Sequence, residues 1–248
     1  MAKVVLVTGA SRGIGAATAK LAAAQGYSVC VNYLQRRDDA DAVVSAITSA
    51  GGQAIAVQAD ISVEADVVRM FEECDTRLGT LSALVNNAGI LETQTRLESM
   101  NTARFQRVFS TNIIGTFLCA REAVRRMSST HGGAGGAIVN VSSMAARLGA
   151  PREYVDYAAS KGAIDTFTIG LAGEVAEDGI RVNAVRPGLI YTEIHASGGE
   201  PGRVDRVKAA VPMKRGGMPD EVARAILWLL SDDASYTTGS ILDVSGGR

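Results

Sequence analysis

The feature that most constrains this chain is a glycine-rich turn near its N-terminus, set between an apolar run and a helical pattern. Val4–Val7 is β-branched or aliphatic at every position, which is typical of a strand buried on both faces of a parallel sheet. Apolar residues then recur at helical spacing until Gly26. Between the two, Gly9, Gly13 and Gly15 leave backbone N–H groups uncovered at a helix N-terminus, where the helix dipole favours an anion. The stretch predicts a cradle for a pyrophosphate.

The spacing of these glycines leaves a second interpretation open. It is G-x-x-x-G-x-G, whereas the usual dinucleotide fingerprint is G-x-G-x-x-G. On this stretch alone, a tight strand-to-helix turn without a ligand is the alternative.

Short apolar strands alternate with helical segments along the whole chain, which indicates βαβ crossovers and a parallel sheet. A chain of 248 residues of this pattern is commonly one unit. We therefore predict an α/β single-domain Rossmann fold, residues 1–248, with a doubly wound parallel seven-stranded sheet and helices on both faces. The predicted strands are residues 4–7, 28–33, 53–59, 81–87, 137–141, 180–185 and 240–244. The main helices are one that ends at Gly26 and residues 38–50, 64–78, 104–127, 157–178 and 220–231.

Charge and cysteine content exclude several classes of partner. Lys plus Arg number 25 and Asp plus Glu number 26, so no global field favours nucleic acid or an anionic membrane. Cys30, Cys74 and Cys119 lack metal-ligand spacing, and we expect buried thiols and no metal. No apolar run approaches ~18 residues, and the N-terminus lacks a signal-peptide pattern. We expect a cytoplasmic protein that acts on a small molecule.

Glycine, asparagine, serine and proline follow four of the predicted strands directly. They stand at residues 8–15, 86–89, 142–143 and 187–188. In doubly wound sheets, ligands bind beyond the carboxyl ends of the strands. These four segments are therefore expected to meet at one site.

The sequence T-G-A-S-R-G-I-G at residues 8–15 resembles the cofactor turn of the short-chain dehydrogenase/reductase family, and the resemblance extends over residues 3–247. The chain is most similar to the branch shared by glucose 1-dehydrogenases and 3-oxoacyl-carrier-protein reductases. The resemblance implies a nicotinamide dinucleotide bound by Gly9, Ser11, Arg12, Gly13, Ile14, Gly15, Asn32, Arg36, Asp60, Ile61, Asn86, Ala88, Gly89, Tyr157, Lys161, Pro187, Gly188, Ile190 and Thr192.

The candidate catalytic residues begin with Tyr157 and Lys161, which lie four apart and hence on one face of a helix. Such a pair is often structural, but two further residues favour catalysis. Ser143 ends the fifth strand, and Asn112 is an amide on an apolar helix face that needs its hydrogen bonds met. The family's catalytic set is Asn, Ser, Tyr and Lys, and all four match.

Two neighbouring residues compete with this assignment. Ser142 is an alternative to Ser143, which we prefer because the second serine of such a pair is the usual donor in the family. Tyr154 is an unsuitable base because Ala158, and no lysine, stands four residues later.

The chemistry explains why these residue types are expected together. Hydride transfer at a carbinol carbon needs a proton moved at its oxygen, and tyrosine has an unperturbed pKa near ~10. A shift of about three pKa units is ~4 kcal/mol, similar to one unit charge at ~4 Å in an effective dielectric of about 20. We therefore expect Lys161 to lower the Tyr157 pKa. By resemblance, Ser143 holds the substrate oxygen, Lys161 also holds the nicotinamide ribose, and Asn112 orders a water relay.

Basic residues near the second strand favour NADP, with NAD possible. Asn32 stands where NAD-dependent relatives carry a carboxylate that would repel a 2′-phosphate. Arg12 in the turn, with Arg36 and Arg37 beyond the strand, supplies cations. The alternative for Arg36 and Arg37 is a solvated loop.

The predicted function is interconversion of a carbonyl and an alcohol by an NADP(H)-dependent oxidoreductase. The narrower alternatives are a 3-oxoacyl-carrier-protein reductase and a sugar (glucose 1-) dehydrogenase. The alternative outside catalysis is an idle dinucleotide sensor, which would need the glycine turn but no Tyr157–Lys161 pair.

We expect a substrate lid around residues 190–215, in which the glycines of residues 196–202 allow movement. His195 is a candidate substrate contact or an ordinary loop histidine, and His131 is expected to be solvated. The basic residues of this lid form either a solvated face or a surface for an acidic carrier protein: Arg203, Arg206, Lys208, Lys214 and Arg215.

Small residues in the helix predicted at residues 157–178 point to self-association. Gly162, Gly170 and Gly173 each cost about 0.5–1 kcal/mol in a helix interior relative to alanine. With the helix at residues 104–127, this helix is expected to pack against the same pair of a second copy. A second interface over residues 220–244 would complete a homotetramer, with a dimer as the alternative.

Overall fold

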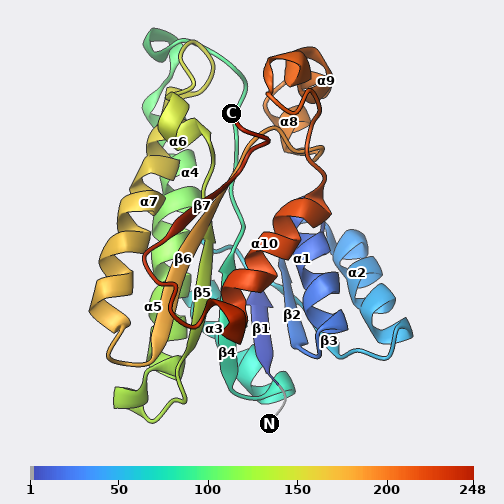
Figure 1. Ribbon diagram of the computed structural model, residues 1–248, viewed down its shortest axis with the longest axis vertical. Helices are drawn as coiled ribbons and strands as arrows, with labels where there is room; N and C mark the ends of the chain where they lie inside the picture. Colours follow the sequence, from blue (N-terminus) through green and yellow to red (C-terminus); the bar gives the residue numbers. More distant parts are fainter. Residues whose placement is uncertain (1–2) are drawn as a thin grey trace.

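The computed structural model describes residues 3–248, and one sheet of seven parallel strands runs through them (Figure 1). The spatial order of the strands is β3-β2-β1-β4-β5-β6-β7. The sheet consists of β1 (Val4–Val7), β2 (Ser28–Tyr33), β3 (Ala54–Gln58), β4 (Leu81–Asn86), β5 (Gly136–Val141), β6 (Ile180–Pro187) and β7 (Ile241–Val244). The predicted seven-stranded parallel sheet in a single doubly wound domain is confirmed.

Helices cover both faces of the sheet, because successive strand residues point to opposite sides. Val5 and Val7 pack with α1 (Gly13–Ala24), α2 (Arg37–Ser49) and α10 (Pro219–Leu230). Val4 and Leu6 pack with α3 (Glu64–Leu78), α5 (Thr116–Met127) and α7 (Val155–Val175). The remaining α-helices are α4 (Thr102–Phe109) and the short α6 (Ala145–Leu148), α8 (Ile194–Ser197) and α9 (Arg203–Val207). All three cysteines are buried and free, as predicted.

The helix predicted over residues 104–127 is confirmed as one helical run, but its middle is π-helical, which the sequence did not predict. A π-helical segment, Ser110–Gly115, separates α4 from α5. π-segments are rare and often occur at functional sites. Here the segment carries the fully buried Asn112, whose backbone carbonyl accepts a hydrogen bond from the Thr116 hydroxyl at 3.0 Å. The amide on the apolar helix face therefore coincides with a change of helix type.

The strand order reverses beside β1, which lies between β2 and β4. The glycine turn follows β1 and the segment at residues 87–89 follows β4, so both leave the sheet at its carboxyl edge on either side of this reversal. This is the position at which doubly wound sheets bind ligands. Within residues 3–248, no helix is long and apolar enough to span a membrane, and no cluster of side chains is suited to hold a metal ion.

Candidate active site

The glycine turn is held in a shape that side chains would prevent. Gly9 has φ +61°, and a Cβ there would stand 2.9 Å from the Cα of Ala88. Gly13 has φ +55°, and a Cβ there would stand 3.3 Å from Thr192. A Cβ at Gly15 would stand 2.6 Å from the Gly9 carbonyl oxygen. The first two glycines supply left-handed backbone, and all three allow close packing of the turn.

The N-terminus of α1 is left open for an anion. Its N-cap residue is Arg12, in extended conformation, whose side chain makes no capping hydrogen bond. The first turn of α1 contains no acidic residue. Exposed N–H groups and the positive end of the helix dipole therefore face the pocket without a competing carboxylate from this turn.

The two asparagines after β4 have different roles. Asn87 lines the pocket, and its Nδ2 donates to the carbonyl oxygens of Thr8 at 2.8 Å and Gly9 at 3.0 Å. Asn86 is buried in the sheet, where its Nδ2 donates to Asn140 Oδ1 at 3.0 Å. The expected ribose contact of Asn86 does not fit this burial. Asn87, which sequence reasoning missed, is the residue of the pair that faces the pocket.

A cavity of about 800 Å³ joins the glycine turn to the predicted catalytic residues. All but three of the predicted site residues line it. The exceptions are Gly15, Asn86 and Asn112, which lie behind the wall. The predicted residues that line the cavity are Gly9, Ser11, Arg12, Gly13, Ile14, Asn32, Arg36, Asp60, Ile61, Ala88, Gly89, Ser143, Tyr157, Lys161, Pro187, Gly188, Ile190 and Thr192.

At the end of the cavity beside the glycine turn, where adenosine is expected, Asn32 supports the turn with its side chain. Its Oδ1 accepts a hydrogen bond from the Gly9 N–H at 3.1 Å, and its Nδ2 donates to the Ala59 carbonyl at 3.1 Å. Arg12 and Arg36 both line the cavity. Arg36 also pairs with Asp39 in an exposed ion pair, whereas Arg12 forms no ion pair within residues 3–248. Arg12 is therefore the cation that is free to meet a ligand.

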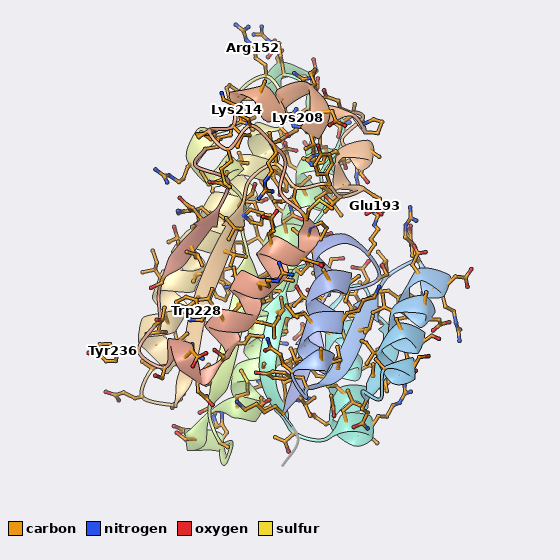
Figure 2. All side chains as sticks on the ribbon, turned by 45° about the vertical axis from the view of Figure 1, so that its right-hand side comes forward. Arg152, Glu193, Lys208, Lys214, Trp228 and Tyr236 are labelled. Carbon is orange, nitrogen blue, oxygen red and sulfur yellow. The ribbon has the colours of Figure 1, made fainter. Side chains whose placement is uncertain are left out.

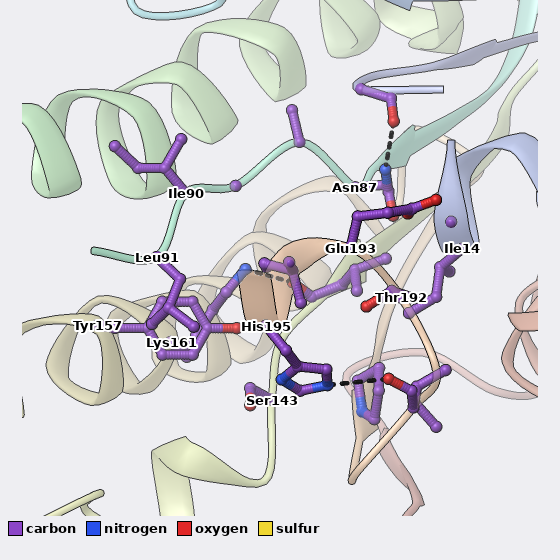
Figure 3. Close-up of a pocket in the computed structure, with 18 of the residues that line it drawn as sticks. Ile14, Asn87, Ile90, Leu91, Ser143, Tyr157, Lys161, Thr192, Glu193 and His195 are labelled. Carbon is purple, nitrogen blue, oxygen red and sulfur yellow. Dashed lines mark hydrogen bonds between the residues drawn. The ribbon is translucent and has the colours of Figure 1, made fainter. Parts of the chain in front are cut away.

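Tyr157 and Ser143 face the opposite end of the cavity from two different elements (Figure 3). Tyr157 lies in the first turn of α7, and Ser143 follows β5. The Ser143 hydroxyl accepts a hydrogen bond from the Ala145 N–H at 3.1 Å, which leaves its own proton to donate. The hydroxyl of Ser142 instead donates to the Lys161 carbonyl oxygen at 3.2 Å. The geometry therefore favours Ser143 over Ser142 as the substrate donor.

The electrostatics of the pair differ from the sequence-based expectation. Burial raises the pKa of Tyr157, and the Ser143 hydroxyl lowers it in part. The Lys161 Nζ donates to the Val141 carbonyl at 2.8 Å and lies 5.7 Å from the Tyr157 ring centroid. Burial lowers the pKa of Lys161 to about 8, while Asp165 opposes this shift. In this structure burial therefore outweighs any lowering of the Tyr157 pKa by the nearby charge, so the net shift is opposite to the expected one.

Asn112 does not line the cavity but holds one of its wall segments by hydrogen bonds to the backbone. Its Oδ1 accepts from the Ile90 N–H at 2.8 Å, and its Nδ2 donates to the Ile90 carbonyl at 3.0 Å and to Ser160 at 3.1 Å. A Cβ at Gly89 would stand 3.3 Å from the Lys161 Nζ and 3.4 Å from the Asn112 Oδ1. The side chain of Asn112 thus fixes the loop that covers Lys161. A water relay at Asn112 stays a prediction.

The end of the cavity beyond Ser143 and Tyr157, where a substrate is expected, has an apolar wall, beside which Glu153, His195 and Arg203 also line the cavity. The side chains of Leu91, Ala145, Leu148, Ala150, Pro151, Tyr154 and Ile194 line it. The Tyr154 ring meets Tyr157 edge to face at 5.7 Å, and burial raises the pKa of Tyr154 to about 12. Tyr154 therefore lines the site as an aromatic wall, which agrees with the prediction that it is unsuitable as a base.

The expected lid is fastened by ion pairs. Arg203 is buried over the Tyr154 ring and forms a bidentate ion pair with Glu153, with N–O distances of 2.9 and 2.6 Å. Glu200 pairs with Arg203 and Arg206 and accepts from the Gln94 amide, and these bonds lower its pKa to about 2. Lys208, which Figure 2 shows at the lid surface, pairs with Asp205, and Arg215 pairs with Glu221. Four of the five basic lid residues are thus neutralised locally, and Lys214 donates to the Ala209 carbonyl.

Comparison with known proteins places these features in context. Residues 9–248 match the family model described as enoyl-(acyl carrier protein) reductase. The chain is 64% identical over 245 residues to the uncharacterized oxidoreductase YgfF of Escherichia coli (strain K12), with 99% of each chain covered. It is 37% identical to glucose 1-dehydrogenase 2 of Bacillus subtilis (strain 168), over 99% of this chain and 94% of that protein.

A solved structure shares the fold along nearly the whole chain. It is a short chain dehydrogenase from Burkholderia cenocepacia J2315 in complex with NADP, with 31% identity and a TM-score of 0.91. The match covers 99% of this chain and 97% of that chain.

Proposed function

The chain belongs to the short-chain dehydrogenase/reductase family, and from this premise we propose that it interconverts a carbonyl compound and an alcohol with NADP(H). The observation that carries the proposal is the arrangement of one cavity. The open N-terminus of α1 and the hydroxyls of Ser143 and Tyr157 all face it. An anion-binding turn and two proton donors in one cavity suit a dinucleotide and a carbonyl oxygen together.

The proposed chemistry divides between the cofactor and the chain. When bound, the nicotinamide supplies or accepts the hydride at the carbon atom. In the direction of reduction, Ser143 donates a hydrogen bond to the carbonyl oxygen, and Tyr157 transfers its phenolic proton to that oxygen as negative charge develops there. In the direction of oxidation, the tyrosinate accepts the alcohol proton.

The charge states of Tyr157 and Lys161 suit proton donation, the step that reduction requires, at neutral pH. The raised pKa of Tyr157 keeps its proton in place for donation. With a pKa of about 8, Lys161 is mostly cationic at pH 7 and stabilises the anion that forms on Tyr157 after proton transfer. Asn112 holds the loop at Ile90 beside Lys161, and so keeps the lysine covered.

Three observations support NADP as the preferred cofactor. Arg12 lines the cavity beside the glycine turn, where it is available to a 2′-phosphate. Asn32 presents no carboxylate, because its amide is neutral and bonded to the turn. The solved relative from Burkholderia cenocepacia holds NADP. NAD is the weaker alternative, because it would leave Arg12 without a phosphate partner.

The substrate is proposed to be a free small molecule with a mainly apolar body. A sugar would need several polar partners, whereas this end of the cavity has an apolar wall, and Arg203 and Glu153 beside it are already engaged with one another. An acidic carrier protein would need several free cations, and four of the five basic lid residues are occupied by local ion pairs, which leaves Lys214 alone. An idle dinucleotide sensor has no use for the proton donors Ser143 and Tyr157. We accordingly propose an enzyme for a free ketone or its alcohol, with residues 190–215 as its lid.

We also propose that the enzyme is a homotetramer and that it works in the cytoplasm. A Cβ added at Gly162, Gly170 or Gly173 would meet no atom within 4 Å, so the fold of one chain does not require glycine there. Phe117 on α5 and Ile169 on α7 are 43% and 57% exposed, although both are large apolar side chains. Trp228, labelled in Figure 2, lies half-exposed on α10, where the second interface is proposed.

A panel of ketones, sugars and acyl thioesters assayed with NADPH and NADH tests this function. We expect NADPH oxidation with apolar ketones, and its loss in Tyr157→Phe with NADPH affinity nearly unchanged, because only the transferable proton is removed. Turnover by Tyr157→Phe at most of the wild-type rate would remove Tyr157 from the mechanism.

A further inference from the structure

A buried acceptor at the substrate end of the cavity has no partner. Within residues 3–248, three buried side-chain atoms lack a hydrogen bond: Asn86 Oδ1, Asp165 Oδ1 and His195 Nδ1. Only His195 lines the cavity, and because its Nδ1 is itself covered, a ligand reaches that atom only with a small shift of α8. Buried polar groups are normally satisfied, so an unpartnered one beside the proton donors calls for an explanation.

The hydrogen bond on the other side of the ring defines what Nδ1 can offer. The His195 Nε2 lies 2.9 Å from the Ile190 carbonyl oxygen, which can only accept, so Nε2 carries the proton. Burial lowers the pKa of His195, which keeps the ring neutral at pH 7. In this tautomer Nδ1 is an unprotonated acceptor.

The surroundings of the ring leave few protein donors for that acceptor. His195 belongs to α8, and in Figure 3 its ring lies on the Ser143 side of the cavity, with Nε2 turned away toward Ile190. Ile194 and Leu91 nearby are apolar. The cation of Arg203 is already engaged by Glu153 and Glu200.

We propose that His195 determines substrate specificity by accepting, at Nδ1, a hydrogen bond from a hydroxyl group carried next to the reacting carbonyl. The proposal rests on the proposed function and narrows its substrate class to hydroxyketones with an apolar body and the diols into which they are converted. The carbonyl oxygen lies with Ser143 and Tyr157, the hydroxyl with His195, and the remainder of the molecule against the apolar wall.

Two substitutions separate the acceptor role of His195 Nδ1 from the hydrogen bond between His195 Nε2 and the Ile190 carbonyl. An asparagine Oδ1 lies two bonds from Cβ, as histidine Nδ1 does, and a glutamine Nε2 lies three bonds from Cβ, as histidine Nε2 does. His195→Asn therefore keeps an acceptor but gives up the bond to the Ile190 carbonyl. His195→Gln keeps a donor for Ile190 but presents no Nδ1 lone pair.

The test compares 2-hydroxyacetophenone with propiophenone, in which a methyl group replaces the hydroxyl. The measured quantity is the ratio of kcat/KM for the two ketones with NADPH. We expect His195→Gln to lower this ratio about tenfold, the value of one hydrogen bond to a buried group, and His195→Asn to retain most of it. Intrinsic differences in ketone reactivity cancel between variants. An unchanged ratio in His195→Gln, or an equal loss in both variants, would overturn the proposal.

A binding measurement on the unaltered chain serves if a variant does not fold. The chain has 2 histidines, so ¹⁵N-histidine NMR resolves His195 once His131→Gln has assigned the other. With NADP⁺ present no reduction occurs, and 2-hydroxyacetophenone is expected to shift the Nδ1 resonance while propiophenone does not. Equal shifts with both ketones contradict the role of His195. Failure to reduce either ketone refutes the proposed function instead, because the NMR readout needs no turnover.

Discussion

Removal of Arg104 from α4 tests whether the start of α7, where Tyr157 lies, depends on a buried charge pair. The Arg104 guanidinium contacts both oxygens of Asp156, at 2.7 and 3.0 Å, and donates to the Thr93 carbonyl at 2.6 Å. The two side chains are 8% and 1% exposed. One arginine thus joins α4, the loop beside the substrate and the residue preceding Tyr157.

Arg104→Met leaves the Asp156 carboxylate buried without its partner. Breaking one side of a buried ion pair costs about 3–5 kcal/mol, because the remaining charge stays desolvated. Replacing both partners, as in Arg104→Met with Asp156→Leu, removes that charge and is expected to recover most of the loss.

The matched control lies on the same helix. Arg107 also forms a bidentate ion pair, with Glu92, at N–O distances of 2.7 and 3.1 Å. Its side chain is 56% exposed and that of Glu92 is 25% exposed. Arg107→Met should cost no more than about 1 kcal/mol. The two variants differ mainly in the burial of the pair that they break.

Urea unfolding at one fixed protein concentration measures both variants, since self-association shifts apparent stability. We expect a clear loss for Arg104→Met, a small one for Arg107→Met, and partial recovery in the double variant. Equal losses for the two single variants would refute the assignment of the cost to desolvation. A double variant as unstable as Arg104→Met would do the same.

Three further outcomes follow from the site and the surface. Arg12→Ala should weaken NADPH by about 1.5–3 kcal/mol and NADH far less, as measured by fluorescence titration, and equal losses would show that Arg12 does not contact the 2′-phosphate. Carbonyl reduction should decline as pH rises through about 8, because Lys161 is cationic below that pKa and neutral above it, and a flat kcat/KM profile from pH 7 to pH 9 would argue against this role. Light scattering should report a tetramer at micromolar concentration and a smaller species for Ile169→Glu, whose side chain is 57% exposed, whereas a monomeric wild type would reject the assembly.

The sheet was predictable because its signals are local. Runs such as Val4–Val7 are buried on both faces, and a two-sided apolar environment selects β-branched residues whatever the partner strands are. The glycine turn was predictable for a similar reason. Gly9 and Gly13 have positive φ, which glycine adopts far more readily than other residues, so the glycines in the sequence mark the turn.

Other features depend on tertiary contacts that sequence spacing does not encode. The π-segment at Asn112 arises where its amide bonds to Ile90 and Ser160, which are distant in the chain. The division of roles between Asn86 and Asn87 depends on where β4 ends, and strand ends are uncertain by a residue or more from sequence. The ion-pair partners of the basic lid residues could not be predicted either, because Arg203 pairs with Glu153, which is 50 residues away in the sequence.

Transfer of deuterium from [4,4-²H₂]NADPH, in which both hydrogens at C4 are labelled, to a ketone tests the central claim most directly. The account predicts that the alcohol formed by the wild-type enzyme carries one deuterium on the carbinol carbon, and that Tyr157→Phe forms almost none of this alcohol. Mass spectrometry of the product measures both. Cofactor oxidation without labelled alcohol, or labelled alcohol formed equally fast by Tyr157→Phe, would contradict hydride transfer coupled to proton donation by Tyr157.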